Sequence, residues 1–149
     1  MKNFFSDEDF VELMEYHTED MINLLLNKGM FFSILVNIAE VTFEPELPQE
    51  IQENFKPITL FAIAGYTYET VEISDKFLVF EAGFGQKSIG SIVTVPLHSI
   101  IQILAEDTPI FINLSRKLNH EKVKNKIQRS KNIFLSNPEN KKYLKKRKS

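Results

Sequence analysis

The sequence predicts a mainly β domain with flanking helices, of the α+β class, in which a small antiparallel barrel follows an N-terminal helix. Three observations predict this class. Apolar residues recur at helical spacing near the N-terminus. Short alternating apolar runs follow, separated by turn residues, which is typical of strands that pair with their neighbours in sequence. A lysine-rich segment then closes the chain, and its composition does not favour a packed core.

The first helix is expected over residues 6–27. Ser6 is the predicted N-cap, and residues 7–9 place three carboxylates in the first turn, where the positive end of a helix stabilises them. Gly29 supplies the stop, because glycine readily adopts the conformation that ends a helix. The apolar stripe consists of Phe10, Leu13, Met14, Ile22, Leu25 and Leu26.

The central part of the chain has the pattern of β-strands. Pro45 and Pro48 end the first strand, because proline cannot continue a central strand. A polar connection then leads to the next strand. The strands are expected at residues 31–43, 58–64, 66–73, 77–82, 90–95 and 109–114, with the polar connection at residues 49–56.

One further helix is expected between the last two strands. Pro96 suits the first position of a helix over residues 97–106. The apolar residues Leu97, Ile100, Ile101 and Leu104 would share one of its faces. Strands joined by short turns, with one helix before them and one late, favour a small antiparallel barrel.

Charge divides the chain into a body, residues 1–115, and a basic tail, residues 116–149. The body has five Lys or Arg against eighteen Asp or Glu, and the tail has thirteen against two. There is no cysteine, no apolar run is long enough for a membrane span, and the N-terminus lacks the pattern of a signal peptide. We therefore expect a cytoplasmic protein that does not interact with membranes.

No catalytic constellation is visible. The chain has no nucleophile motif, and its three histidines (17, 98 and 120) lie in separate elements without the spacing of a metal site. Glu44, Glu46, Glu69 and Glu72 are interpreted as solvated surface or turn residues. The glycines of segment 83–85 lie between two expected strands, so a bulge or a close backbone approach explains them better than a phosphate loop. We expect no enzyme, no metal and no cofactor.

The tail leaves two interpretations open. Its clustered lysines can bind phosphates, and hence RNA or a ribosome, with strong salt dependence. They can equally be a solvated end that folds back onto the acidic body. The residues concerned are Tyr143, Leu144, Lys145, Lys146 and Arg147. Residues 120–135 could form a basic helix, and residues 139–149 are expected to be disordered in isolation.

Several segments resemble the stringent starvation protein B family. They are Leu24–Asn27 before Ile34–Asn37, the pair Pro45 and Pro48, Ile58–Ile63, the strand end Phe80-Glu81-Ala82-Gly83-Phe84-Gly85, and Val93–Ala105 with its Val95-Pro96-Leu97 start. The resemblance covers about residues 20–115. Gly83 stands where the family commonly has an arginine, and the tail is shorter and richer in lysine than in the family.

The resemblance implies a Sm-like or SH3-like barrel in a non-enzymatic, homodimeric adaptor that dimerises through its N-terminal helix. It implies a groove for an extended degradation-tag-like peptide, and delivery of the tagged protein to the AAA+ protease ClpXP through its unfoldase. Tyr143–Lys146 would dock on the unfoldase. The residues placed by the groove are Phe84, Gly85, Ala82 and Phe80, with Ile34 and Val36 beside them. A plain core role is the stronger interpretation for Phe80, Ile34 and Val36.

Overall fold

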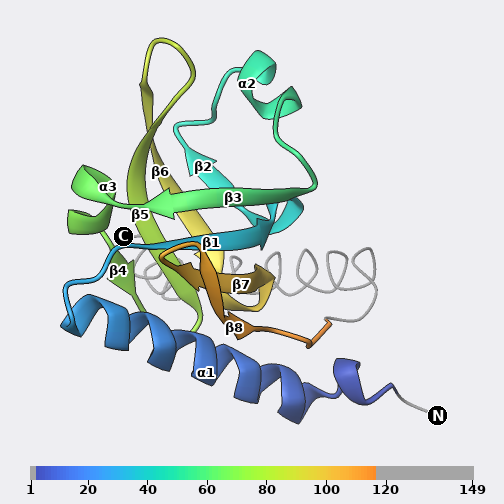
Figure 1. Cartoon of the computed structure of the whole chain (residues 1–149). Coiled ribbons are helices and arrows are strands. Elements are labelled where there is room, and N and C mark those ends of the chain that lie inside the picture. The colour runs from blue at the N-terminus through green and yellow to red at the C-terminus, as the bar shows by residue number, and fades with distance from the viewer. Residues whose placement is uncertain (1–2, 117–149) are drawn as a thin grey trace, which may run out of the picture. The chain divides into compact units, whose positions relative to one another are not determined.

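A computed structural model describes residues 3–116 of the chain. This part is an α+β fold with an N-terminal helix and two antiparallel sheets of four strands each (Figure 1). The helices are α1 (Glu8–Asn27), α2 (Gln49–Glu53) and α3 (Gly65–Glu69), and the 3-10 turns are η1 (Phe4–Ser6), η2 (Ile38–Glu40) and η3 (Leu97–Ser99). The strands are β1 (Phe32–Asn37), β2 (Thr42–Glu44), β3 (Ile58–Ile63), β4 (Glu72–Ile73), β5 (Phe77–Phe84), β6 (Ile89–Pro96), β7 (Ile100–Ala105) and β8 (Thr108–Ile112).

Helix α1 confirms the predicted N-terminal helix, with a different cap. Asp7 is the N-cap, and its side chain accepts a hydrogen bond of 3.2 Å from the backbone N–H of Phe10. Ser6 is not the cap, because it belongs to the preceding turn η1. Gly29 follows the helix with a φ of +67°, as a glycine stop requires. The stripe that α1 buries consists of Val11, Glu15, Thr18, Ile22 and Leu25.

The two sheets share one core. The first sheet has the strand order β3-β1-β7-β8 and the second has β2-β6-β5-β4. In β1 the residues alternate strictly between buried and half-buried, so one face of the first sheet points into the core. The core cluster joins side chains of α1, such as Ile22, to side chains of both sheets, such as Ile34 and Phe80. Burial of this shared apolar surface holds helix and sheets together.

A closed barrel is not confirmed. Among the described residues the strands pair within two separate sheets, and no ladder joins one sheet to the other. The barrel prediction assumed that strands consecutive in sequence pair all the way round. Instead, β1 pairs with β3 and β7 on its two sides, while β2 leaves for the other sheet after the turn at η2.

Two predicted elements have the wrong type. Residues 66–73, expected as one strand, form helix α3 and then the two-residue strand β4. Residues 97–106, expected as a helix, form the turn η3 and then the strand β7. In both regions, contacts with residues distant in sequence override the local pattern.

Smaller differences concern element bounds. Residues 31–43 are two strands, because the Asn37 side chain accepts a hydrogen bond of 3.3 Å from the backbone N–H of Ala39 and the chain turns there. The polar connection at residues 49–56 contains α2. Strand β5 runs two residues further than expected, to Phe84.

The basic tail lies almost entirely outside the described residues. The predicted helix at 120–135 and the predicted disorder at 139–149 both fall there, as do Tyr143, Leu144, Lys145, Lys146 and Arg147. Within residues 3–116, α1 is the longest helix, and no helix is both long and apolar enough to cross a bilayer.

Candidate functional site

A groove of about 500 Å³ lies over the β5–β6 hairpin and the end of β2, and we call it the hairpin groove. The turn of this hairpin is at the end of the strands far from α1 (Figure 1). The groove is lined by Glu44, Pro45, Tyr66, Glu81, Ala82, Gly83, Ser88, Gly90, Ser91 and Ile92.

Two facing glycines make this surface hollow. In the β5–β6 ladder Gly83 lies opposite Gly90, so this row of the sheet has no side chains. A Cβ added at Gly90 would meet no atom within 4 Å. The next row on the same face of the sheet is Glu44, Ile92 and Glu81, which are paired across three neighbouring strands. Residues paired in this way project on the same side of a sheet, so this row forms a wall beside the glycine floor.

The backbone edge of β6 is free beside the groove. Strand β2 ends at Glu44, which is paired with Ile92, and the following Pro45 has no N–H to continue the ladder. Ser91 donates a side-chain hydrogen bond of 2.9 Å to the carbonyl oxygen of Pro45 and so holds the departing chain. From Ile89 to Ser91, β6 pairs with β5, and no other described strand pairs with its opposite side.

The hairpin groove is acidic. Glu44 and Glu81 line it, and no lysine or arginine among residues 3–116 does. The hydroxyl of Tyr66 donates a hydrogen bond of 3.1 Å to Oε2 of Glu81. This hydrogen bond, and then the negative charge of Glu81, raises the pKa of Tyr66 above the ordinary value of a tyrosine. The two ion pairs seen among residues 3–116 join Lys76 to Glu15 and His98 to Glu40, and neither involves a groove carboxylate.

The structure brings only part of the predicted site to this groove. Ala82 lines the groove. Gly85 lies in the turn beyond it with a φ of +75°, and a Cβ there would come within 2.9 Å of Cδ1 of Ile51. Phe80, Ile34 and Val36 are 1%, 0% and 0% exposed, which places them in the core.

Phe84 supports the hairpin from the other side. Its half-buried ring packs edge-on against Phe43 and Phe55, at centroid distances of 5.5 and 5.9 Å. Phe43 and Phe55 are themselves stacked at 5.5 Å, and Phe61 lies 6.2 Å from Phe84. We call these four rings the aromatic cluster. It anchors the hairpin that carries the groove, and it contains the residue that sequence reasoning favoured most.

Of the ten residues that line the groove, the site predicted from sequence contains only Ala82. The nine others are Glu44, Pro45, Tyr66, Glu81, Gly83, Ser88, Gly90, Ser91 and Ile92. The signal for Gly90 was present, because a hairpin turn between the two expected strands can pair it with Gly83. No local signal places Glu44 beside Ile92, since that pairing joins segments distant in sequence.

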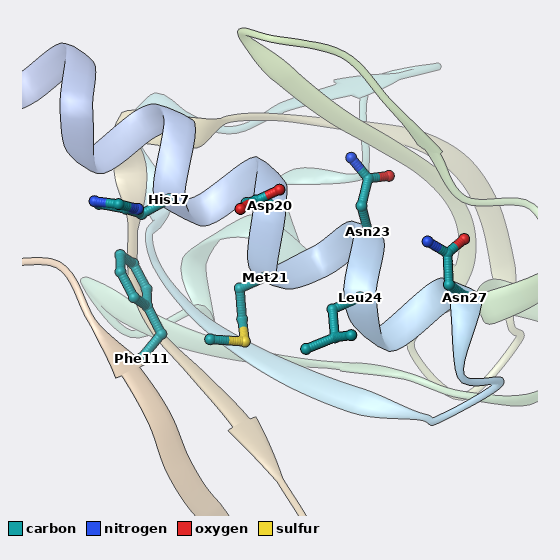
Figure 2. A pocket seen from close by; sticks show the side chains of 7 residues that line it. All are labelled: His17, Asp20, Met21, Asn23, Leu24, Asn27 and Phe111. Carbon is teal, nitrogen blue, oxygen red and sulfur yellow. The ribbon is translucent and has the colours of Figure 1, made fainter.

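A second groove, of about 410 Å³, lies between α1 and β8. Figure 2 shows Met21 and Leu24 of α1 on the side of the helix where Phe111 lies, with Asn23 on the opposite side. The groove is lined by His17, Asp20, Met21, Asn23, Leu24, Asn27 and Phe111. The adjoining surface of α1 carries exposed Leu13 and Tyr16.

Metal chemistry has no visible site in the described part of the chain. No group of three or more His, Asp or Glu side chains among residues 3–116 is arranged to hold a metal ion. His17 is exposed on α1, and His98 lies 3.8 Å from a carboxylate oxygen of Glu40.

Comparisons with known proteins assign no family. No protein-family model matches the chain, and no curated protein sequence matches it. The resemblance to the stringent starvation protein B family rests on the segments quoted above, and it enters below as a proposal.

Proposed function

We propose that this chain is a non-enzymatic, cytoplasmic adaptor that binds an extended, degradation-tag-like peptide in the hairpin groove and delivers the tagged protein to an AAA+ protease. The observation that carries the proposal is the edge of β6 at Ile89 and Gly90, which pairs with no strand of residues 3–116 and lies beside a hollow floored by Gly83 and Gly90. No cofactor takes part in this function.

A free strand edge beside a hollow suits an extended peptide. The main chain of the peptide hydrogen-bonds to the edge, and its alternate side chains enter the hollow. Ile89 and Gly90 offer roughly 7 Å of edge, since a strand advances about 3.3 Å per residue. An edge of this length is enough for a short recognition motif.

The finer fold assignment belongs to the same proposal. We retain the Sm-like or SH3-like arrangement as the description of how the two sheets relate. It is supported by the antiparallel pairing of every strand and by the single core shared by both sheets. The proposed peptide binding needs only the β5–β6 hairpin and the early end of β2.

Peptide binding is tested by fluorescence polarisation with labelled degradation-tag peptides and the full-length protein. Gly90→Val should weaken binding at least tenfold, because valine fits a strand and its side chain fills the open floor. Ala62→Val is the matched control, since Ala62 is an exposed strand residue outside the groove. Equal binding by both variants, or no binding by the unmodified protein, contradicts the proposed function.

We place the homodimer interface on α1. The helix buries one stripe in its own core and leaves Leu13, Tyr16 and Leu24 exposed by 48%, 58% and 50%. Such a row suits a second copy of the same helix, and it lies far from the hairpin turn (Figure 1).

Light scattering tests this interface. The unmodified protein should have the mass of a dimer, and the variant Tyr16→Glu with Leu24→Glu should have that of a monomer. Lys56→Glu, at an exposed position outside α1, makes the same change of two negative charges and should leave the dimer intact.

We place unfoldase docking at Tyr143, Leu144, Lys145, Lys146 and Arg147. The alternative function, RNA or ribosome association through the tail, is favoured by its excess of thirteen basic residues over two acidic ones. A pull-down from lysate separates the two. Replacing Lys145, Lys146 and Arg147 by Glu should release an unfoldase, whereas loss of salt-sensitive RNA would favour the alternative.

A further inference from the structure

We infer that the hairpin groove selects peptides with a lysine or arginine side chain, carried over Ile92 between Glu44 and Glu81. This inference rests on the proposed peptide-binding function and names the class of peptide. The evidence is the geometry of one row of the sheet, the charges around it, and the apolar surface beneath it.

The row holds its two carboxylates at a distance that suits one cationic side chain. Glu44 and Glu81 are the ladder partners of Ile92 on its two sides. Neighbouring strands lie about 4.8 Å apart, so the Cα atoms of the two glutamates are roughly 10 Å apart. Each side chain spans part of that gap, and a single ammonium or guanidinium group above Ile92 can contact both carboxylates.

The charges of the groove are unbalanced. Neither Glu44 nor Glu81 pairs with a basic side chain of residues 3–116. Lys87, which precedes the groove residue Ser88, is exposed in the hairpin turn and does not line the groove. The surrounding body has eighteen acidic against five basic residues. Such a surface attracts cations at long range and repels acidic peptides.

Tyr66 and Ile92 complete a site for a long cationic side chain. The Tyr66 hydroxyl engages Oε2 of Glu81, which orients this carboxylate and leaves Oε1 for a ligand. The tyrosine is 67% exposed and Ile92 is 42% exposed. An exposed ring and an exposed aliphatic side chain provide apolar surface for the methylene stem of lysine or arginine, while its charged end reaches the glutamates.

The test uses full-length protein and fluorescein-labelled decapeptides. Each peptide carries arginine, glutamine or glutamate at one position of an alanine–asparagine host, and the position is varied along the peptide. At one position, arginine should bind about three- to tenfold more tightly than glutamine, and glutamate more weakly, as expected for two solvent-exposed ion pairs. The preference should shrink at 0.5 M salt, because salt screens exposed charges.

The decisive variant is the pair Glu44→Gln and Glu81→Gln. It should abolish the preference, so that the arginine and glutamine peptides bind this variant with equal affinity. The pair Glu12→Gln and Glu53→Gln, exposed residues outside the groove, makes the same change in net charge and should keep the preference.

The outcomes separate this inference from the proposed function. If arginine, glutamine and glutamate peptides bind equally and Gly90→Val still blocks them, the charge selection is wrong and the adaptor function stands. If no peptide binds, or Gly90→Val changes nothing, the proposed function itself fails. If replacing Lys145, Lys146 and Arg147 by Glu raises the affinity for the arginine peptide tenfold, the occupant is the chain's own tail and the inference of a partner peptide is wrong.

Discussion

Tyr66 reports on the electrostatics of the hairpin groove at the scale of one residue. Its pKa is raised first by its hydrogen bond to Glu81, then by the charge of that carboxylate, and least by the charge of Glu69. We expect Glu81→Gln to lower the pKa of Tyr66 towards the ordinary tyrosine value, and Glu69→Gln to lower it much less. Absorbance at 295 nm between pH 8 and 12, with Tyr66→Phe subtracted to isolate this phenol, measures the shift.

A buried carboxylate on α1 depends on one lysine. Glu15 is 6% exposed, and its Oε1 lies 3.2 Å from Nζ of Lys76. We predict that Lys76→Ala lowers the free energy of unfolding by about 1–3 kcal/mol, because the charge of Glu15 then stays buried without its partner. The double variant Glu15→Leu with Lys76→Ala should recover most of this loss. Urea unfolding followed by circular dichroism measures both, and an unchanged Lys76→Ala protein would show that water reaches Glu15.

Gly83 and Gly85 show what the sequence could predict about single residues. Their position between two strands predicted a close backbone approach, and a Cβ at Gly83 would lie 3.4 Å from the backbone of Ser88. Gly85, with its positive φ, forms the turn. The function of Glu44 and Glu81 could not be predicted, because each belongs to an unremarkable strand until the register places both beside Ile92.

Strand β7 shows why local periodicity fails at the scale of an element. Its residues suggested a helix because apolar side chains recur three and four positions apart. The structure places β7 inside the first sheet, between β1 and β8. In the ladder with β1, Leu35 pairs with Gln102 and Val36 with Ile100, so Ile101 is bulged out, and the burial pattern of β7 no longer has a period of two. The three isoleucines of β7 favour a strand, and pairing with β1 and β8 stabilises this conformation over the helix.

Helix α3 is the converse case, because a strand was predicted there and a helix is observed. Residues 66–73 alternate like a strand, but Gly65 has a φ of +58° and turns the chain at the end of β3. Thr70 then donates a side-chain hydrogen bond of 2.7 Å to the carbonyl oxygen of Thr67. Its Oγ1 also accepts a hydrogen bond of 2.8 Å from the N–H of Glu81, which ties α3 to β5. No feature of the alternating pattern predicts this contact.

Tyr68 of α3 caps the C-terminus of α1. Its hydroxyl donates to the carbonyl oxygens of Leu25 and Leu26, at 3.2 and 3.4 Å. We predict that Tyr68→Phe costs about 0.5–1.5 kcal/mol and loosens the end of α1, because the ring contacts remain and the hydrogen bonds are lost. Hydrogen exchange should speed up in the last turn of α1 and stay unchanged in its first turn. Uniformly faster exchange along α1 would assign Tyr68 to the packing of the whole helix.

At the scale of the whole molecule, the α+β class and the N-terminal helix were predictable from the sequence. Whether the strands close into one barrel or form two sheets was not predictable. Class follows from the order of helical and alternating segments, which is local information. Closure depends on which strands end early, and here β2 has three residues and β4 has two. Because β2 is short, it pairs with β6 only from Ile92 to Thr94. The edge of β6 before Ile92 therefore pairs with no other described strand.

The separation between core and groove yields the last prediction. Ile34 is fully buried in β1. The family resemblance placed it beside the groove, and a core role was the stronger interpretation of its sequence. We expect Ile34→Val to lower the free energy of unfolding by about 0.5–1.5 kcal/mol, since it removes one buried methylene from a packed interior. Peptide affinity should not change, because Ile34 does not line the hairpin groove and the variant stays folded at 25 °C. Gly90→Val should show the reverse, with lost affinity and nearly unchanged stability, because a Cβ at this position meets no atom within 4 Å. If Ile34→Val weakens peptide binding as much as Gly90→Val does, the peptide contacts the core-facing side of β1, and the site must be moved from the hairpin to the space between the two sheets.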